Sequence, residues 1–278
     1  MRLFPHQVNL SLSRSKLSGL LSYFLGQANQ SAPSDALPLW IGGHLCGSLR
    51  RAAVETLRAS RSVRLHTHTV HIGDELTSLP ALNETLAEIA LALKAAGQAP
   101  GWRDERLDVW SEQNQSIAGI ERGVVRPLGL VTKAVHLNGL SADGGIWVAR
   151  RSLTKATDPG VWDTLVGGLV GYQEDPEIAL IRESDEEAGL DAPQISQRTS
   201  LRKITRMHRQ VKEGFQAEDV LTSECVLESG VTPQNRDGEV MEIACLAPDT
   251  LMRMLGEDAF TIEASIVLAE DLLRRSVG

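Results

Sequence analysis

One stretch constrains the fold of this chain more than any other. Residues 167–190 read GGLVGYQEDPEIALIRESDEEAGL. Asp175 and Pro176 can start a helix there, because aspartate is a good N-cap and a proline in the first turn lacks only an N–H that would stay unpaired. Gly189 can end it as a C-terminal cap. We therefore expect a helix from about Pro176 to Ala188, preceded by a glycine-bounded loop.

The expected helix has an acidic face and a core face, since successive side chains are about 100° apart. Glu183, Glu186 and Glu187 share the acidic face, which we expect to point to solvent. Ser184 falls on the core face, where its hydroxyl can bond back to the carbonyl of Leu180.

Three carboxylates at this spacing repel one another by a few tenths of a kcal/mol per pair. A divalent cation removes that penalty, and an all-oxygen ligand set suits Mg²⁺ or Mn²⁺, with phosphate oxygens of a substrate as further ligands. A bare run of such glutamates is usually a solvated helix face. Here Glu174 and Arg182 stand in register with the glycines, which favours a metal site.

The spacing of these residues resembles the signature of the Nudix (MutT-like) hydrolases, G-x5-E-x7-R-E-U-x-E-E-x-G-U, with U a bulky apolar residue. Only Ser184 departs from it. The resemblance implies an α/β fold, an α/β/α sandwich with a mixed sheet. It also implies Mg²⁺-dependent hydrolysis of a diphosphate linked to a further group X.

Roles for individual residues follow from the same resemblance. The implied metal ligands are Glu183, Glu186, Glu187 and the carbonyl of Gly168. Arg182 can orient Glu186, and Glu174 can order the loop. The general base stays open between Glu187 and Glu239.

The chain of 278 residues is longer than one typical domain, so we expect two. Residues 102–105, 120–122 and 128–129 resemble an N-terminal extension of unknown function, found before the Nudix domain in proteins related to fungal thiamine pyrophosphokinase. We expect a smaller α+β domain of open role over residues 1–125 and the Nudix domain over residues 126–278.

Cations just upstream of the motif point to the same subfamily. A stretch similar to its R-R-S-x-T-K-x-x-x-P-G supplies Arg150, Arg151 and Lys155, which could bind the diphosphate or simply be surface charge at a strand end. Gly214, Gln216 and Glu218 are similar to its G-x-Q-x-E, and residues 237–240 to its D-G-E-V. Glu239 is then a further acidic group near the metals, or a turn carboxylate in solvent.

The subfamily resemblance suggests thiamine diphosphate, or its oxidised analogues, hydrolysed to the monophosphate. ADP-ribose or a nucleotide sugar is the alternative within the same reaction. A non-hydrolytic nucleotide-binding regulator and an isoprenoid diphosphate isomerase are alternatives of other classes.

Alternation and helical periodicity predict the remaining elements. Helices are expected over residues 48–59, 78–96, 248–255 and 263–275, and an amphipathic helix carrying Leu17 and Phe24. Strands are expected over residues 63–72, 130–137, 146–150, 201–206 and 219–227. The first of these strands holds His66, His68 and His71, which read as ordinary strand residues more readily than as a metal site.

Composition narrows the partners and the compartment. A net charge of −8 argues against nonspecific nucleic-acid binding and leaves a small-molecule diphosphate as the expected partner. The first 16 residues lack a clean apolar leader, no run of 18 apolar residues occurs, and the three cysteines form no Cys-x-x-Cys pair. We expect a cytoplasmic protein without membrane contact. Its oligomeric state stays open, with a homodimer as one alternative.

Overall fold

The computed structural model describes residues 14–155 and 157–276. Most of the N-terminal stretch on which the expectation of no leader rests, residues 1–13, lies outside them. Among the residues described, no helix is both long enough and apolar enough to cross a bilayer. Cys46, Cys225 and Cys245 are all free thiols.

A mixed seven-stranded sheet forms the centre of the molecule. Five strands follow the order β11-β12-β7-β8-β13, with β10 paired to β7 and β9 to β8. The β7–β12 pair is parallel and the other pairs are antiparallel. The strands are β7 (Val131–Leu140), β8 (Ile146–Arg151), β9 (Trp162–Thr164), β10 (Val166–Leu169), β11 (Arg202–Val211), β12 (Gly214–Val226) and β13 (Val240–Leu246).

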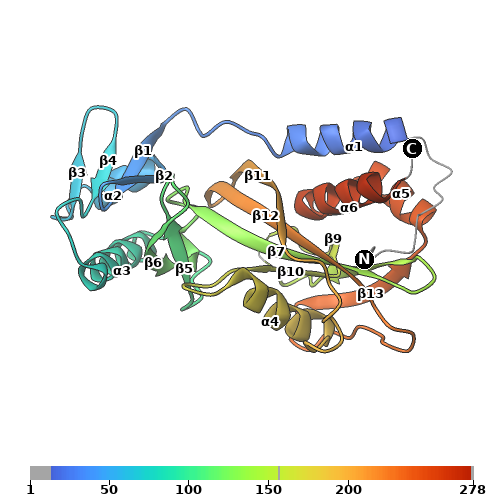
Figure 1. Ribbon diagram of the computed structural model, residues 1–278. Coiled ribbons are helices and arrows are strands. Elements are labelled where there is room, and N and C mark those ends of the chain that lie inside the picture. The colour runs from blue at the N-terminus through green and yellow to red at the C-terminus, as the bar shows by residue number, and fades with distance from the viewer. Residues whose placement is uncertain (1–13, 156, 277–278) are drawn as a thin grey trace.

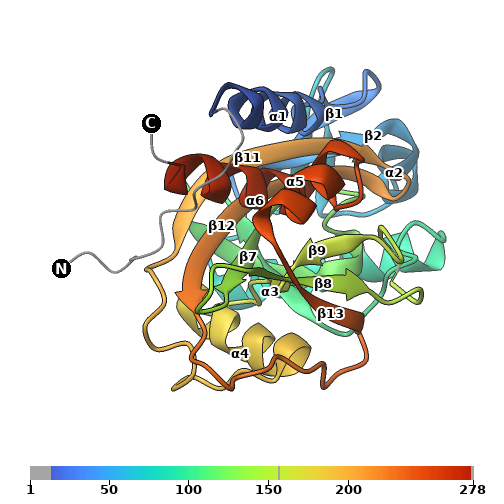
Figure 2. The same cartoon turned by 90° about the vertical axis from the view of Figure 1, so that its right-hand side faces the viewer.

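Helices cover both faces of this sheet, as Figures 1 and 2 show. Helix α4 (Pro176–Ala188) lies on one face, and α5 (Pro248–Gly256) and α6 (Ile262–Arg275) lie on the other. Alternate residues of the strands point to opposite faces. Val135 and Leu137 therefore pack with α4, while Val148 and Val220 pack with α6. The expected α/β/α sandwich with a mixed sheet is confirmed.

Residues 36–124 build a second, smaller group of elements beside the main sheet (Figure 1). Its buried core contains Leu39, Leu86 and Ile120 and reaches Leu130, at the entry to β7. A four-stranded sheet, β2-β1-β4-β3, and a hairpin, β5-β6, contribute to it. The elements are β1 (Ala36–Ile41), β2 (His44–Arg50), α2 (Arg51–Leu57), β3 (Val63–Leu65), β4 (Val70–Ile72), α3 (Leu79–Ala95), β5 (Arg106–Trp110), β6 (Ser116–Glu121) and the 3-10 turn η1 (Arg122–Val124).

The first helix, α1 (Arg14–Gln27), does not join this N-terminal group. Its buried residues Leu17 and Phe24 belong to the core formed with α5 and α6, and Figure 2 shows α1 stacked outside those helices. The chain then crosses to β1 (Figure 1). The division at residues 125 and 126 stays a prediction, and α1 packs across it.

Three expectations about single elements are wrong in part. Residues 63–72 form two short antiparallel strands, β3 and β4, rather than one, and His66 and His68 lie in the turn between them. The ring of His71 stacks on Trp40, and its Nδ1 lies 2.5 Å from Asp74 Oδ2. The helix expected from residue 48 begins at Arg51, and β12 starts five residues earlier than expected, at Gly214 rather than Asp219.

Candidate active site at the edge of the sheet

Helix α4 has the ends that its sequence predicts. The side chain of Asp175 caps the first turn by accepting a hydrogen bond from the backbone N–H of Glu177 at 2.8 Å. Gly189 ends the helix in the left-handed conformation, with φ of 63°. Ser184 is fully buried, and its hydroxyl donates to the carbonyl of Leu180 at 2.6 Å. Its presence at an apolar position of the motif therefore leaves no polar group unpaired.

Arg182 ties the helix to the loop before it. Its Nε and Nη2 donate to the two carboxylate oxygens of Glu174 at 2.9 and 3.0 Å, and Glu174 also accepts from the N–H of Gly171 at 2.8 Å. The Nη1 atom donates to Glu183 at 2.7 Å and to Glu186 at 3.2 Å. One guanidinium thus positions two of the three motif carboxylates. Its hydrogen bonds also hold the pKa of Glu174 below the ordinary value.

The two glycines of β10 let the helix carboxylates reach the strand backbone. A Cβ atom added to Gly168 would overlap the carboxylate of Glu183. At Gly167, the backbone N–H donates to Glu187 Oε2 at 2.9 Å. Any side chain at position 168 would displace Glu183, so the motif requires glycine there for close approach.

Glu187 is the most deeply buried of the motif glutamates. Its side chain is 7% exposed, whereas that of Glu186 is 46% exposed. The expectation that the whole acidic face points to solvent is therefore wrong for Glu187, because α4 presses that residue against β10. Burial raises the pKa of Glu187 to about 8, although Lys155 and the N–H of Gly167 act in the opposite direction. Burial also raises the pKa of Glu183, against the charge of Arg182.

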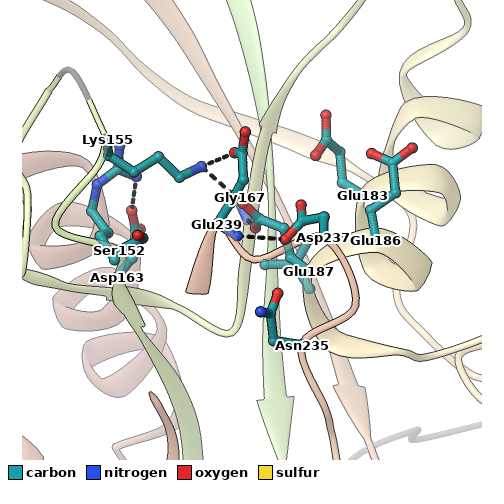
Figure 3. Close-up of polar contacts among 12 residues, drawn as sticks. Ser152, Lys155, Asp163, Gly167, Glu183, Glu186, Glu187, Asn235, Asp237 and Glu239 are labelled. Carbon is teal, nitrogen blue, oxygen red and sulfur yellow. Dashed lines mark hydrogen bonds and ion pairs between the residues drawn. The ribbon is translucent and has the colours of Figure 1, made fainter. Parts of the chain in front are cut away.

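Glu187 has two further carboxylates beside it. Oxygens of Glu187, Asp237 and Glu239 all lie within 4.8 Å of one another, close enough to share a metal ion. The ammonium group of Lys155 lies between them, 3.4 Å from Glu187 Oε1 and in a short contact with Glu239 (Figure 3). Burial works to raise the pKa of Glu239, but the hydrogen bond and charge of Lys155 outweigh it and the pKa is lowered.

The upstream cations separate in the structure. A recess opens beside Gly167 and Gly168, and Arg151 and Lys155 line it. Arg151 donates to Asp163 at 2.8 Å there. Arg150 does not join them, because consecutive residues of a strand point to opposite faces. It donates to the carbonyl of Gly160 at 3.0 Å and lies near Glu242.

The recess extends from the motif toward the N-terminal group of elements. One hollow of about 140 Å³ and a second of about 170 Å³ share Arg103, Arg122 and Arg126 as common walls. Arg126 donates to Thr157 at 2.8 Å, and Arg122 pairs with Glu105 at 2.8 Å. Both hollows are also lined by Gln216 and Glu218 of β12, and the first by His136 of β7 and Glu263 of α6.

Sequence reasoning missed most of these recess residues as site residues. Arg103 and Arg122 lie in segments used only to recognise the N-terminal extension, and Gln216 and Glu218 in the stretch similar to G-x-Q-x-E. Those segments were the sequence signal from which these residues could have been assigned to the site. Asp237 lies in the stretch similar to D-G-E-V, from which only Glu239 was taken as a site residue. His136, Asp163 and Glu263 carried no local signal, since only the pairing of distant strands and the start of α6 bring them together.

Comparisons with known proteins agree with the family that the motif helix indicates. A profile of the NUDIX domain matches residues 132–264. An uncharacterised protein of Saccharomyces cerevisiae is 26% identical over 191 residues, which cover 63% of this chain and 55% of the relative. Nudix hydrolase 20, chloroplastic, of Arabidopsis thaliana is 23% identical over 253 residues, covering 86% of this chain and 67% of the relative.

A third relative is matched over almost its whole length. The isopentenyl-diphosphate Delta-isomerase of Kocuria rhizophila is 30% identical over 185 residues, which cover 63% of this chain and 96% of that enzyme. By contrast, this chain spans little more than half of the yeast relative. The motif helix, the hydrogen bonds of Arg182 that hold it to the preceding loop, and the surrounding α/β/α sandwich agree with these matches. Together they show that the chain belongs to the NUDIX family.

Proposed function

We propose that the protein is a divalent-metal-dependent hydrolase that cleaves a diphosphate linkage. The observation that carries the proposal is that two clusters of carboxylate side chains lie together at one edge of the sheet. Glu183 and Glu186 are held by Arg182. Glu187 lies close to Asp237 and Glu239, and the Lys155 ammonium contacts Glu187 and Glu239. If the glutamates formed only a solvated helix face, Glu187 would not be buried, and the carboxylates would not pack against Gly167 and Gly168 of β10.

The donor set fits a hard divalent cation. Every side-chain donor is a carboxylate, and the ammonium of Lys155 already occupies a position of positive charge between two of them. We propose Glu183, Glu186, Glu187 and the carbonyl of Gly168 as ligands, joined by Asp237 and Glu239. Magnesium ions bound there would neutralise the diphosphate and lower the pKa of an attacking water.

The chain's own residues would divide the remaining work. Arg151 and Lys155 in the recess are placed to bind phosphate oxygens, with Arg103 and Arg122 on the facing wall. Arg182 and Glu174 hold the loop and the helix in register and touch no substrate in this scheme. Glu187 and Glu239 are the two candidates for the group that accepts the proton of the attacking water.

The substrate that we propose first is thiamine diphosphate, or an oxidised analogue, cleaved to the monophosphate. Support comes from the segments similar to the thiamine-related subfamily. ADP-ribose is the alternative for the same reaction. We also propose the domain division at residues 125 and 126, with the N-terminal domain forming one wall of the substrate site. A cytoplasmic location and a homodimer stay predictions.

A second candidate reaction is isomerisation of an isoprenoid diphosphate, which the match to the Kocuria enzyme favours. The two reactions differ in the fate of the diphosphate, because isomerisation leaves it intact. Phosphorus NMR of the purified protein with Mg²⁺ and each of thiamine diphosphate, ADP-ribose and isopentenyl diphosphate separates them. We expect monophosphate products from one of the first two. An unchanged diphosphate with a rearranged double bond would replace hydrolysis by isomerisation.

A further inference from the structure

The floor of the recess is made of polar residues on one face of two neighbouring strands. Glu218 of β12 lies in register with Thr132 of β7. Alternate residues then continue the same face, Ala134 and His136 on β7 and Gln216 on β12. Gln216 is 3% exposed, His136 4% and Glu218 5%. This floor belongs to the same recess as Gly167, Gly168 and Lys155.

Hydrogen bonds within the floor fix the direction of the Gln216 amide. Its Nε2 donates to Glu218 Oε1 and to Glu263 Oε1, each at 3.2 Å. Because both partners are carboxylates, the nitrogen must face them and the carbonyl oxygen must face away. That oxygen is buried and has no hydrogen-bond partner among the described residues.

His136 presents a second acceptor of the same kind. Thr164 Oγ1 donates its proton to the carbonyl of Val166 at 2.8 Å, so it accepts from His136 Nδ1 at 3.0 Å. The other ring nitrogen, Nε2, then carries a free lone pair. It too is buried without a partner in the described part of the chain. Burial lowers the pKa of His136, which keeps the ring neutral.

Glu218 adds negative charge to this floor. Its oxygens accept from Gln216 and from Thr132 Oγ1, the latter at 2.8 Å, but no cation of the described residues forms an ion pair with it. Glu263, by comparison, has Arg209 3.5 Å away. A buried acceptor left unpaired costs about 1–3 kcal/mol, and a native structure retains one mainly where a ligand or water satisfies it.

We propose that this floor binds group X of the substrate, and that X is a nitrogen heterocycle carrying an amino group or a positive charge. The proposal rests on the diphosphate-hydrolase function proposed above. A hydrogen-bond donor of X would meet Gln216 Oε1 and its charge would meet Glu218, while His136 Nε2, at the Gly167 end of the floor, would accept from the part of the substrate next to the diphosphate. Thr132 is in register with Glu218, and His136 is in register with Gly167. The two β7 residues are four positions apart, which is about 13 Å along the strand. That length places X at one end of the recess and the diphosphate at the metal carboxylates.

The charges of the recess agree with this orientation. Arginine and lysine side chains surround the end near the motif and the N-terminal wall, whereas carboxylates of Glu218 and Glu263 lie at the floor. A diphosphate ester of a cationic or amino-bearing ring complements both. A hydrocarbon group, as in isopentenyl diphosphate, would leave the acceptors unpaired.

Binding and turnover of a matched set of diphosphates test the proposal on the full chain. The probes are thiamine diphosphate and ADP-ribose, which carry amino-bearing rings, and isopentenyl diphosphate and methyl diphosphate, which do not. The key variant is Glu218→Gln, which keeps the shape and can still contact Gln216 and Thr132. Glu228→Gln, an exposed site just beyond the same strand, is the matched control.

We expect the wild-type protein to bind at least one amino-bearing probe tenfold or more tightly than methyl diphosphate in calorimetry with Ca²⁺. Glu218→Gln should remove most of that preference and leave the affinity for methyl diphosphate unchanged, and Glu228→Gln should change neither. Equal affinity for all four probes, tightest binding of isopentenyl diphosphate, or an equal loss for every probe in Glu218→Gln would overturn the proposal.

Turnover with Mg²⁺ separates this proposal from the proposed function. Selective binding without cleavage of any probe would support the floor as the site for X and count against hydrolysis. Cleavage of all four probes at similar kcat/KM would support hydrolysis and overturn the role of the floor.

Discussion

The replacement Glu187→Gln should have opposite effects on stability and on activity. In the metal-free protein, burial raises the pKa of Glu187 from 4.5 to about 8. A carboxyl group whose pKa is higher in the folded than in the unfolded state stabilises the fold fully below the unfolded pKa. That contribution is lost as the pH rises toward the folded pKa. Glutamine has no such titration, so only the wild type should lose it.

The size of the effect follows from the shift. Each pH unit between about 5 and 8 removes about 1.4 kcal/mol of stability from the wild type, so the variant should gain at most about 4 kcal/mol relative to it over this range. For a chain of this length the gain corresponds to roughly 8 °C in Tm. Glu263 and Asp271, whose pKa values burial raises to about 7 and about 6, titrate in both proteins and cancel in the difference.

Thermal unfolding in EDTA at pH 5, 6, 7 and 8 measures this difference directly. We expect nearly equal Tm values at pH 5 and a variant that is clearly more stable at pH 8. Added Mg²⁺ should stabilise the wild type more than the variant, and the variant should lose turnover by orders of magnitude. A Tm difference that does not change with pH, or a variant less stable at pH 8, would refute the burial argument. Wild-type turnover in the variant would refute the assignment of Glu187 to the site.

Three further substitutions test the local geometry. Gly168→Ala should lower Mg²⁺-dependent turnover at least tenfold, because its Cβ would displace the Glu183 carboxylate, whereas Gly19→Ala, which meets no atom within 4 Å, should leave turnover unchanged. Ser184→Ala should cost about 1 kcal/mol in urea unfolding and leave kcat unchanged; a large loss of kcat would show that the hydroxyl matters to the site. Gly189→Ala should cost about 1 kcal/mol or more, because φ is 63° there, and an unchanged urea midpoint would contradict that conformational account.

Local signals predicted the motif helix well. Its first and last residues followed from Asp175, Pro176 and Gly189, whose effects act within one or two turns. The back-bond of Ser184 was predictable for the same reason. Layers of the sandwich came from the family resemblance, and the structure confirms them.

Long-range features could not be predicted in the same way. The burial of Glu187 depends on how closely α4 approaches β10, and no pattern within the helix encodes that distance. The separation of Arg150 from Arg151 was available in principle from strand alternation, but it needed the register of β8. The polar floor of the recess depends on the parallel pairing of β7 with β12, whose paired residues, such as Val131 and Ala217, are 86 positions apart in sequence.

The packing of α1 was missed because amphipathicity shows that a helix has a buried face without showing what covers it. Leu17 and Phe24 were predicted to face a core, and they do. The core is that of α5 and α6, at the opposite end of the chain.

The reaction proposed for the sheet edge around Glu187 is hydrolysis of a diphosphate with the help of a divalent metal. Phosphorus NMR of thiamine diphosphate and ADP-ribose with the wild-type protein, in Mg²⁺ and again in EDTA, tests it most directly. We predict conversion of at least one diphosphate to monophosphates in Mg²⁺, none in EDTA and none with Glu187→Gln. Intact diphosphates in all three samples, or cleavage that continues in EDTA, would contradict the claim.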